Sequence, residues 1–225
     1  MGNKLAAQLF TLREHTKTRD DFISSMKKVA NIGYSGVQIS AVGCMTGDSP
    51  EVSAEEAKKI LDDNGLVCAC THRNWDDFAQ KTDEEIAFHK ALGCDYAAIG
   101  GLPGEFRESA DTFKQFGELA APVADKMKAG GIDFGYHNHA FEFKTMDKGK
   151  SGYDIFIENF SSKMAFEMDV FWVKIGGENP VAKIKELKGR ISQLHLKDLK
   201  KKSVIPNFGK VTPDTFDEIG DGMIK

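Results

Sequence analysis

The chain has 225 residues, of which 41% are hydrophobic and 28% are charged, and its formal net charge is −4. An acidic chain without a long basic run lacks the face that non-specific nucleic-acid binding requires, and no apolar run approaches the length of a membrane span. The N-terminus has no signal-peptide layout, and the four cysteines show no zinc-ribbon spacing. We therefore expect a single domain over residues 1–225, with reduced cysteines, in the cytoplasm.

Short apolar segments of β-prone residues alternate with amphipathic segments along the whole chain. Glycine, asparagine and aspartate mark most of the boundaries between them. Strands are expected at residues 5–12, 37–40, 66–71, 94–99, 132–136, 164–172 and 191–196. Helices are expected at residues 20–30, 53–64, 83–92, 109–129, 153–160 and 180–187. Alternation of this kind predicts an α/β fold with a parallel sheet.

The choice between an open sheet and a closed barrel depends on two further observations. The chain contains no G-x-G-x-x-G loop of the kind that opens many doubly wound sheets, which favours a TIM (β/α) barrel. After the strand at 191–196, the segment 203–225 contains Pro206 and Pro213 and leaves no room for an eighth strand and helix. We therefore expect a TIM barrel that lacks the eighth βα unit, as in a chain truncated at its C-terminus.

The segment FGYHNHAFEF, residues 134–143, gathers ligand-type side chains at the end of a predicted strand. In an extended chain His137 and His139 point the same way, while Asn138 points to the opposite face. Glu142 adds a carboxylate. Neutral imidazole and carboxylate are usual ligands of Zn²⁺, Mn²⁺ and Co²⁺, although the same residues also serve as caps at strand ends.

Two later strands also end in such residues. Asp169 lies in the apolar run 164–172. His195 lies in the segment ISQLHLKD, residues 191–198, and is followed by Lys197. Because the carboxyl ends of parallel strands share one rim of a barrel, three such strand ends predict one site there. Glu167 shares its side of the strand with Asp169, so it is expected either to support the site or to point into the core.

Four segments carry a resemblance to a known family: GYHNHAFEF (135–143), FEMDVFWV (166–173), GRISQLHLKD (189–198) and IGDGMI (219–224). The chain resembles the xylose isomerase-like TIM barrels, the sugar phosphate isomerase/epimerase superfamily that also includes inosose dehydratase and endonuclease IV. In that family a divalent metal lies at the mouth of the barrel. Its ligands are a Glu after strand five, an Asp after strand six, a His after strand seven and a Glu on strand eight.

The resemblance implies a metal site made of Glu142, Asp169 and His195. His137 is the alternative to Glu142, because it occupies the strand position where many relatives carry their Glu. The strand-eight Glu has no counterpart, since IGDGMI is the segment that normally precedes that strand. The bound ion is expected to be Mn²⁺, Co²⁺, Zn²⁺ or Mg²⁺.

The expected catalytic residues are Glu142 as the proton-transferring group, His139 as a second base and Lys197 as a contact to substrate oxygen. The alternative for His139 is a hydrogen bond to substrate or to Glu142, and the alternative for Lys197 is a pair with Asp198. Residues expected to contact substrate are His72, His137, Asn138 and Trp172.

The function implied is a divalent-metal-dependent isomerase or epimerase that acts on a sugar, sugar phosphate or cyclitol through an enediolate. One alternative is a dehydratase or lyase of the inosose dehydratase type. The other is a non-catalytic sugar-binding relative, and the missing strand-eight Glu favours this second alternative. The expected partner is a small carbohydrate, with no nucleic acid and no membrane. The unpaired edges of the strands at 5–12 and 191–196 also allow a homo-oligomer.

Overall fold

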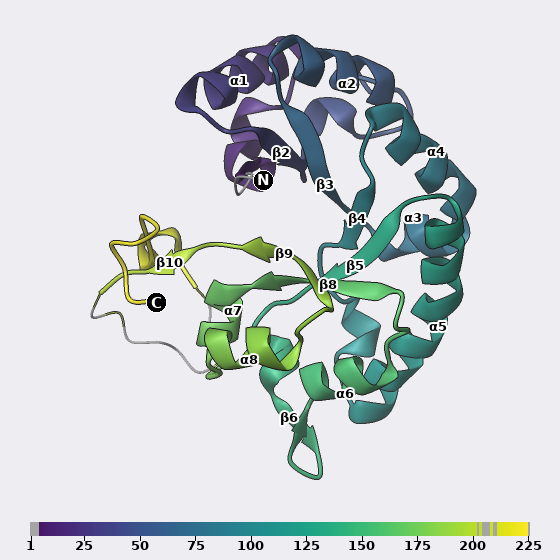
Figure 1. Ribbon diagram of the computed structural model, residues 1–225, viewed down its shortest axis with the longest axis vertical. Helices are drawn as coiled ribbons and strands as arrows, with labels where there is room; N and C mark the ends of the chain where they lie inside the picture. The colour runs from purple at the N-terminus through teal and green to yellow at the C-terminus, as the bar shows by residue number, and fades with distance from the viewer. Residues whose placement is uncertain (1–4, 202, 204–207, 209–210, 225) are drawn as a thin grey trace. The chain divides into compact units, whose positions relative to one another are not determined.

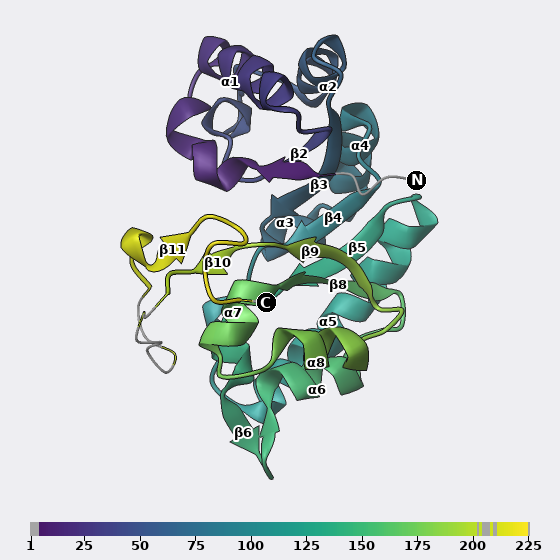
Figure 2. The same ribbon diagram turned by 60° about the vertical axis from the view of Figure 1, so that its left-hand side comes forward.

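The computed structural model describes residues 5–201, 203, 208 and 211–224 (Figures 1 and 2). Pro206, in the segment expected to leave no room for an eighth strand, lies outside the described residues. The chain divides into two compact units. Unit 1 comprises Met1–Ala98 and Lys126–Asp133, and unit 2 comprises Ile99–Asp125 and Phe134–Lys225. Within the described residues, no helix combines the length and apolarity needed to cross a membrane.

Unit 1 alternates strands and helices as the sequence predicts. Its strands follow one another in the order β1, β2, β3, β4, and the pairs β1–β2 and β2–β3 are parallel. The strands are β1 (Ala6–Gln8), β2 (Gly36–Ile39), β3 (Val67–Arg73) and β4 (Tyr96–Ile99), and the helices are α1 (Arg19–Ile32), α2 (Ala54–Asp63), α3 (Trp75–Gln80) and α4 (Thr82–Leu92).

The helix ends of unit 1 follow from local chemistry. The Thr18 side chain caps α1 by accepting a hydrogen bond from Asp21 N, and Gly33 ends it in the left-handed region at φ 108°. The Ser53 side chain accepts a hydrogen bond from Glu56 N at 3.2 Å and caps α2, which begins where the helix at 53–64 was expected. The apolar stripe of α1 is buried against the sheet, as its spacing predicts.

The predicted strand at residues 5–12 is wrong in its second half. Strand β1 ends at Gln8, and Leu9–His15 form a 3₁₀ helix. The Gln8 side chain accepts a hydrogen bond from Phe10 N at 3.1 Å and so caps this helix. A short apolar run cannot be assigned to strand or helix by periodicity alone, and here the side-chain cap decides for helix.

Unit 2 carries three parallel strands in the order β5 (Asp133–His137), β8 (Met164–Asp169), β9 (Ile191–His195). Its helices are α5 (Ala110–Ala129), which contains Pro122 and continues into unit 1, α6 (Gly152–Asn159), α7 (Val170–Ile175) and α8 (Pro180–Glu186). Two short antiparallel pairs complete it: β6 (Thr145–Asp147) with β7 (Lys150–Ser151), and β10 (Asp198–Leu199) with β11 (Phe216–Asp217).

A cluster of aromatic rings joins α5 and α6 to strands β5 and β8. Neighbouring ring centroids lie between 4.5 Å (Phe156–Phe160) and 6.4 Å (Phe116–Tyr136). Rings this large bury much apolar surface and prefer tilted or edge-on contacts, so they hold the strands in a fixed place. The cluster consists of Phe113, Phe116, Tyr136, Phe156, Phe160 and Phe166.

Two features of unit 2 differ from the sequence prediction. The apolar run 164–172 is not one strand, because Asp169 ends β8 and caps α7. The β6–β7 hairpin was not predicted. Its turn residues Lys148 and Gly149 have positive φ angles of 48° and 82°, the geometry of a tight hairpin turn, but Lys is an uncommon residue there and gives no signal.

Candidate metal and substrate site

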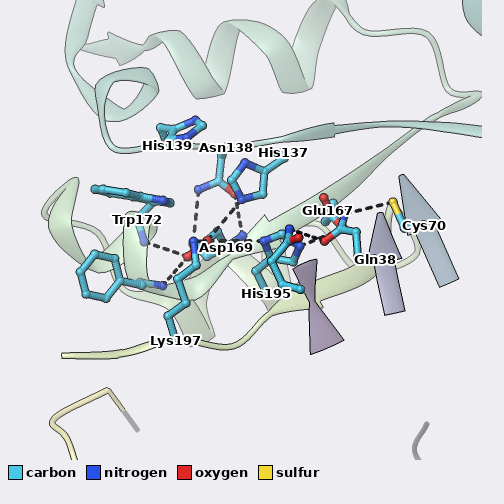
Figure 3. A network of polar contacts seen from close by, with 12 residues as sticks. Gln38, Cys70, His137, Asn138, His139, Glu167, Asp169, Trp172, His195 and Lys197 are labelled. Carbon is cyan, nitrogen blue, oxygen red and sulfur yellow. Dashed lines mark hydrogen bonds and ion pairs between the residues drawn. The ribbon is translucent and has the colours of Figure 1, made fainter. Parts of the chain in front are cut away.

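Each of the three strands of unit 2 ends in a candidate ligand: His137 in β5, Asp169 in β8 and His195 in β9. The strand register pairs Asp169 with His195 and His137 with Glu167. The side chains at these strand ends are therefore brought together, and Figure 3 shows His137, His195 and Lys197 turned toward Asp169.

Asp169 lies at the centre of the group, and its two carboxylate oxygens have different partners. Oδ1 accepts hydrogen bonds from Phe171 N at 3.0 Å and Trp172 N at 3.2 Å, so it caps α7. Oδ2 lies 3.2 Å from His137 Nε2, 3.7 Å from His195 Nδ1 and 2.5 Å from Lys197 Nζ.

Asp169 remains ionised in spite of complete burial. Burial alone would raise its pKa, but hydrogen bonds with His137 and His195 and the charge of Lys197 hold the pKa well below its usual value. The protein thus keeps a permanent negative charge at this point of the strand ends.

His195 lies between two carboxylates, because its Nε2 is also 3.1 Å from Glu167 Oε1. Burial lowers the pKa of His195, but its hydrogen bonds with Asp169 and Glu167 outweigh this and raise the pKa to about 9. A high pKa shows that the surroundings of this ring favour a positive charge.

The donor set fits a divalent cation. One ligand atom from each of His137, Asp169 and His195 lies within 4.8 Å of the other two. Imidazole nitrogen and carboxylate oxygen together suit Zn²⁺, Mn²⁺ and Co²⁺. Glu167 on the other side of His195 matches the carboxylate that commonly orients a metal-binding histidine.

The two residues after His137 have different surroundings. His137 and His139 lie on one side, with ring centroids 4.9 Å apart, which confirms the predicted alternation. Asn138 is fully buried and binds the backbone of Asp169: its Oδ1 accepts from Asp169 N at 2.9 Å, and its Nδ2 donates to Asp169 O at 3.3 Å. These bonds fix the end of β5 to the end of β8, and substrate contact by Asn138 stays a prediction.

Glu142 lies in a short 3₁₀ helix, Phe141–Phe143, rather than at a strand end. Its side chain is fully buried and accepts hydrogen bonds from Tyr136 OH at 2.6 Å and from His139 N at 3.0 Å. Burial raises the pKa of Glu142 to about 7, although both hydrogen bonds oppose the rise. Among the described residues, the triads of closely spaced ligand atoms do not include Glu142. Metal binding and proton transfer by Glu142 stay predictions, and its contacts favour a role in holding His139.

An aromatic wall lies beside the charged cluster. The His139 ring is 5.5 Å from that of Trp172 and stacks at 6.0 Å on Phe141. Lys197 Nζ lies 5.7 Å from the Trp172 ring centroid. Gly101 packs so closely that an added Cβ would lie 3.2 Å from Cε1 of His139. A flat wall next to cationic and anionic groups suits the C–H face of a carbohydrate.

The remaining candidate, His72, is half-buried at the end of β3 in unit 1, and its contact with substrate stays a prediction. Tyr136 was not singled out by the sequence analysis. Nothing distinguishes Tyr136 from an ordinary core residue in sequence, since its hydroxyl finds Glu142 only when the 3₁₀ helix folds back.

Comparison with known proteins places the chain in a family. A sequence model described as xylose isomerase-like TIM barrel matches residues 26–225. Two solved sugar phosphate isomerase/epimerases from Parabacteroides distasonis are similar in structure. The first is 24% identical with a TM-score of 0.76, over 94% of this chain and 80% of that one. The second is 26% identical with a TM-score of 0.75, over 92% and 84%.

A probable 3-DHS dehydratase, AsbF, from Bacillus anthracis has a TM-score of 0.74 at 11% identity, over 99% of this chain and 86% of that one. A search of curated protein sequences finds no match. The family model covers most of the chain, and the structural neighbours share the predicted fold. The protein belongs to the xylose isomerase-like TIM barrel family.

Proposed function

We propose that the protein is a divalent-metal-dependent isomerase or epimerase of a sugar, sugar phosphate or cyclitol. The proposal rests on one observation: His137, Asp169 and His195 place ligand atoms within 4.8 Å of one another at the ends of three neighbouring strands. The likeness to two sugar phosphate isomerase/epimerases supports the same reaction class.

In this proposal His137, Asp169 and His195 hold the cation, and Glu167 orients His195. The bound ion supplies Lewis acidity, which polarises a substrate carbonyl and makes the neighbouring C–H more acidic. Lys197, with its ammonium between Asp169 and the Trp172 ring, donates a hydrogen bond to a substrate oxygen that gains negative charge.

His139 is the proposed proton-transferring residue. Its ring is half-buried in the aromatic wall, and the hydrogen bonds from its backbone N to Glu142 fix its position. It removes the proton next to the carbonyl and returns it to the adjacent carbon in an isomerase. Glu142 is the alternative base, since a pKa of about 7 suits proton transfer near neutrality.

Metal binding is tested first, on EDTA-treated protein titrated with Co²⁺ and followed by visible absorbance and calorimetry. We expect one ion per chain, and Asp169→Asn should weaken binding by about 100-fold through loss of a charged ligand. Asp147→Asn, an exposed carboxylate of the β6–β7 hairpin, is the matched control. Equal Co²⁺ affinity in the Asp169 variant and the parent would exclude this site.

The reaction is tested in D₂O with a panel of ketopentoses, ketohexoses and their phosphates, with deuterium uptake followed by NMR. His139→Gln should slow exchange by at least about 100-fold while Co²⁺ binding persists. If Glu142→Gln instead abolishes exchange and His139→Gln does not, Glu142 is the base. Loss of water from the substrate, seen by mass spectrometry, would identify a dehydratase, which the likeness to AsbF makes the second candidate.

A further inference from the structure

The segment IGDGMI, residues 219–224, is organised around one buried side chain, that of Asp198. Asp198 begins β10, three residues after β9 ends at His195. Its carboxylate accepts four backbone hydrogen bonds: Oδ1 from Leu199 N at 2.8 Å and Ile224 N at 2.9 Å, and Oδ2 from Gly220 N at 3.0 Å and Gly222 N at 3.1 Å. Three of the four donors lie more than twenty residues away in sequence, so one carboxylate joins the start of β10 to residues 220–224.

The two glycines of the segment are required by this arrangement. Gly220 has a φ of 101°, in the left-handed region that other residues avoid. A Cβ on Gly222 would lie 2.3 Å from Asp198 Oδ1 and 2.5 Å from Leu199 O, both far inside van der Waals contact. The two glycines of the Gly-Asp-Gly sequence therefore allow the backbone to approach the Asp198 carboxylate closely enough to donate these hydrogen bonds.

Further contacts attach the same segment to helix α7. Met223 N donates to Leu199 O at 2.9 Å, and Ile224 packs against the hydrophobic cluster that includes Phe171 and Ile175 of α7. Strand β11 pairs with β10, which brings the Phe216 ring onto Phe171 with centroids 4.5 Å apart. Asp198 is thus fixed against the helix whose first turn is capped by Asp169.

These contacts bear on Lys197, the residue immediately before Asp198. On one side of it, His195 is held by strand pairing with Asp169; on the other, Asp198 is held by its four donors. Only Leu196 and Lys197 lie between these two fixed points. A lysine side chain loses much rotamer freedom when it is held in one ion pair, and a backbone that is already fixed adds no ordering cost of its own.

We propose that Asp198 is a positioning residue: by folding residues 220–224 around its carboxylate, it fixes the backbone at Lys197 and so holds the Lys197 ammonium on Asp169. The ion pair has an Nζ–Oδ2 distance of 2.5 Å, and the lysine side chain is 31% exposed. The effect on catalysis rests on the function proposed above, whereas the placement of Lys197 does not.

The test measures the reactivity of each lysine in the full 225-residue chain, treated with EDTA, by limited acetylation with acetic anhydride and peptide mass spectrometry. Asp198→Asn keeps the size of the side chain but turns an NH₂ group toward two N–H donors. Gly222→Ala keeps the carboxylate and disrupts the segment sterically. Both variants should raise the acetylation rate of Lys197 by about threefold, as expected for loss of a partly exposed ion pair.

The controls are Asp221→Asn, an exposed carboxylate in the same segment, and Gly104→Ala, a glycine with open space around its Cβ position. Both should leave Lys197 unchanged, and Asp169→Asn gives the rate of an unpaired Lys197. If Asp198→Asn does not fold by circular dichroism, Gly222→Ala carries the test.

Hydrogen exchange of the amides at 220–224 separates positioning of Lys197 from a purely structural role. Faster exchange there together with an unchanged Lys197 rate would overturn the proposal, because Asp198 would then hold only its own segment. Faster exchange with a faster Lys197 rate supports it. Because metal and substrate are absent, failure of the proposed function leaves this result unaffected.

Discussion

Two histidines, the buried His89 in unit 1 and the largely buried His195 in unit 2, show how their partners decide the charge of an imidazole. His89 is fully buried in α4, and its Nδ1 lies 2.6 Å from the carbonyl of Glu85. A carbonyl only accepts, so Nδ1 carries the proton, and Nε2 then accepts from the Thr71 hydroxyl at 2.7 Å. Burial lowers the pKa of His89, and the ring stays neutral.

The difference from His195 is not the absence of a carboxylate near His89. The Glu85 side chain lies 3.8 Å from His89 Nδ1, but Arg73 binds it with two nitrogens, the shortest distance being 2.6 Å. Glu167 and Asp169, by contrast, both face His195 and raise its pKa to about 9. A buried histidine therefore becomes a candidate site when the nearby carboxylates outnumber the cations that neutralise them.

The largest expected effect is that of Asp169→Ala. The change removes the partner of His137, His195 and Lys197 and the cap of α7, leaving buried groups without their counter-charge. We expect the free energy of unfolding to fall by about 3–5 kcal/mol, measured by urea denaturation of metal-free protein. A loss below about 1 kcal/mol would show that the cluster stays hydrated and that Asp169 does not hold it together.

His89→Leu should cost less, about 2–3 kcal/mol in the same measurement, because it leaves the buried Thr71 hydroxyl without its acceptor. Adding Thr71→Val should recover part of the loss, since both polar partners are then gone. Co²⁺ binding should be unchanged in the single variant, because the proposed ligands belong to unit 2. A loss of Co²⁺ affinity would contradict the purely structural role of His89.

The lowered pKa of His89 predicts a specific pH dependence of stability. An unfolded histidine takes up a proton near pH 6.5, whereas the folded ring resists, so its stabilising contribution is complete above that pH and is lost as the pH falls below it. The charged groups facing the ring are Glu85, which opposes the shift, and Arg73, which supports it. Unfolding by urea between pH 7.5 and 5.5 should show a decline that is smaller in His89→Leu. Equal declines would assign the pH dependence to other groups.

Periodicity and breaker residues predicted much of the fold, because helix caps and apolar stripes are local. Ser53 and Pro180 stand where the helices expected at 53–64 and 180–187 begin, and each suits a helix start by its own chemistry. The hairpin at Lys148–Gly149 and the 3₁₀ helix after Gln8 were missed because their sequences favour no single conformation.

The site was predictable only in part. Asp169 and His195 follow strands, so parallel pairing brings them together, as expected from their spacing. Glu142 was chosen by its residue type and its place in the motif. Its actual contacts depend on how the chain turns after β5, which carries Glu142 to Tyr136 OH and His139 N. Such tertiary contacts leave no local pattern in the sequence.

The smallest change in stability is expected for Lys197→Met, a variant that tests whether Lys197 stabilises unit 2 or acts only in the proposed site. Lys197→Met keeps the length of the side chain over the Trp172 ring and removes an ion pair that is partly exposed, so the free energy of unfolding should change by less than about 1 kcal/mol. Co²⁺ affinity should rise by about three- to tenfold, because the ammonium no longer competes for Asp169 Oδ2. Lys188→Met, at an exposed lysine, should alter neither quantity. If the substitution instead weakens Co²⁺ binding, Lys197 supports the metal ligands rather than competing with the ion.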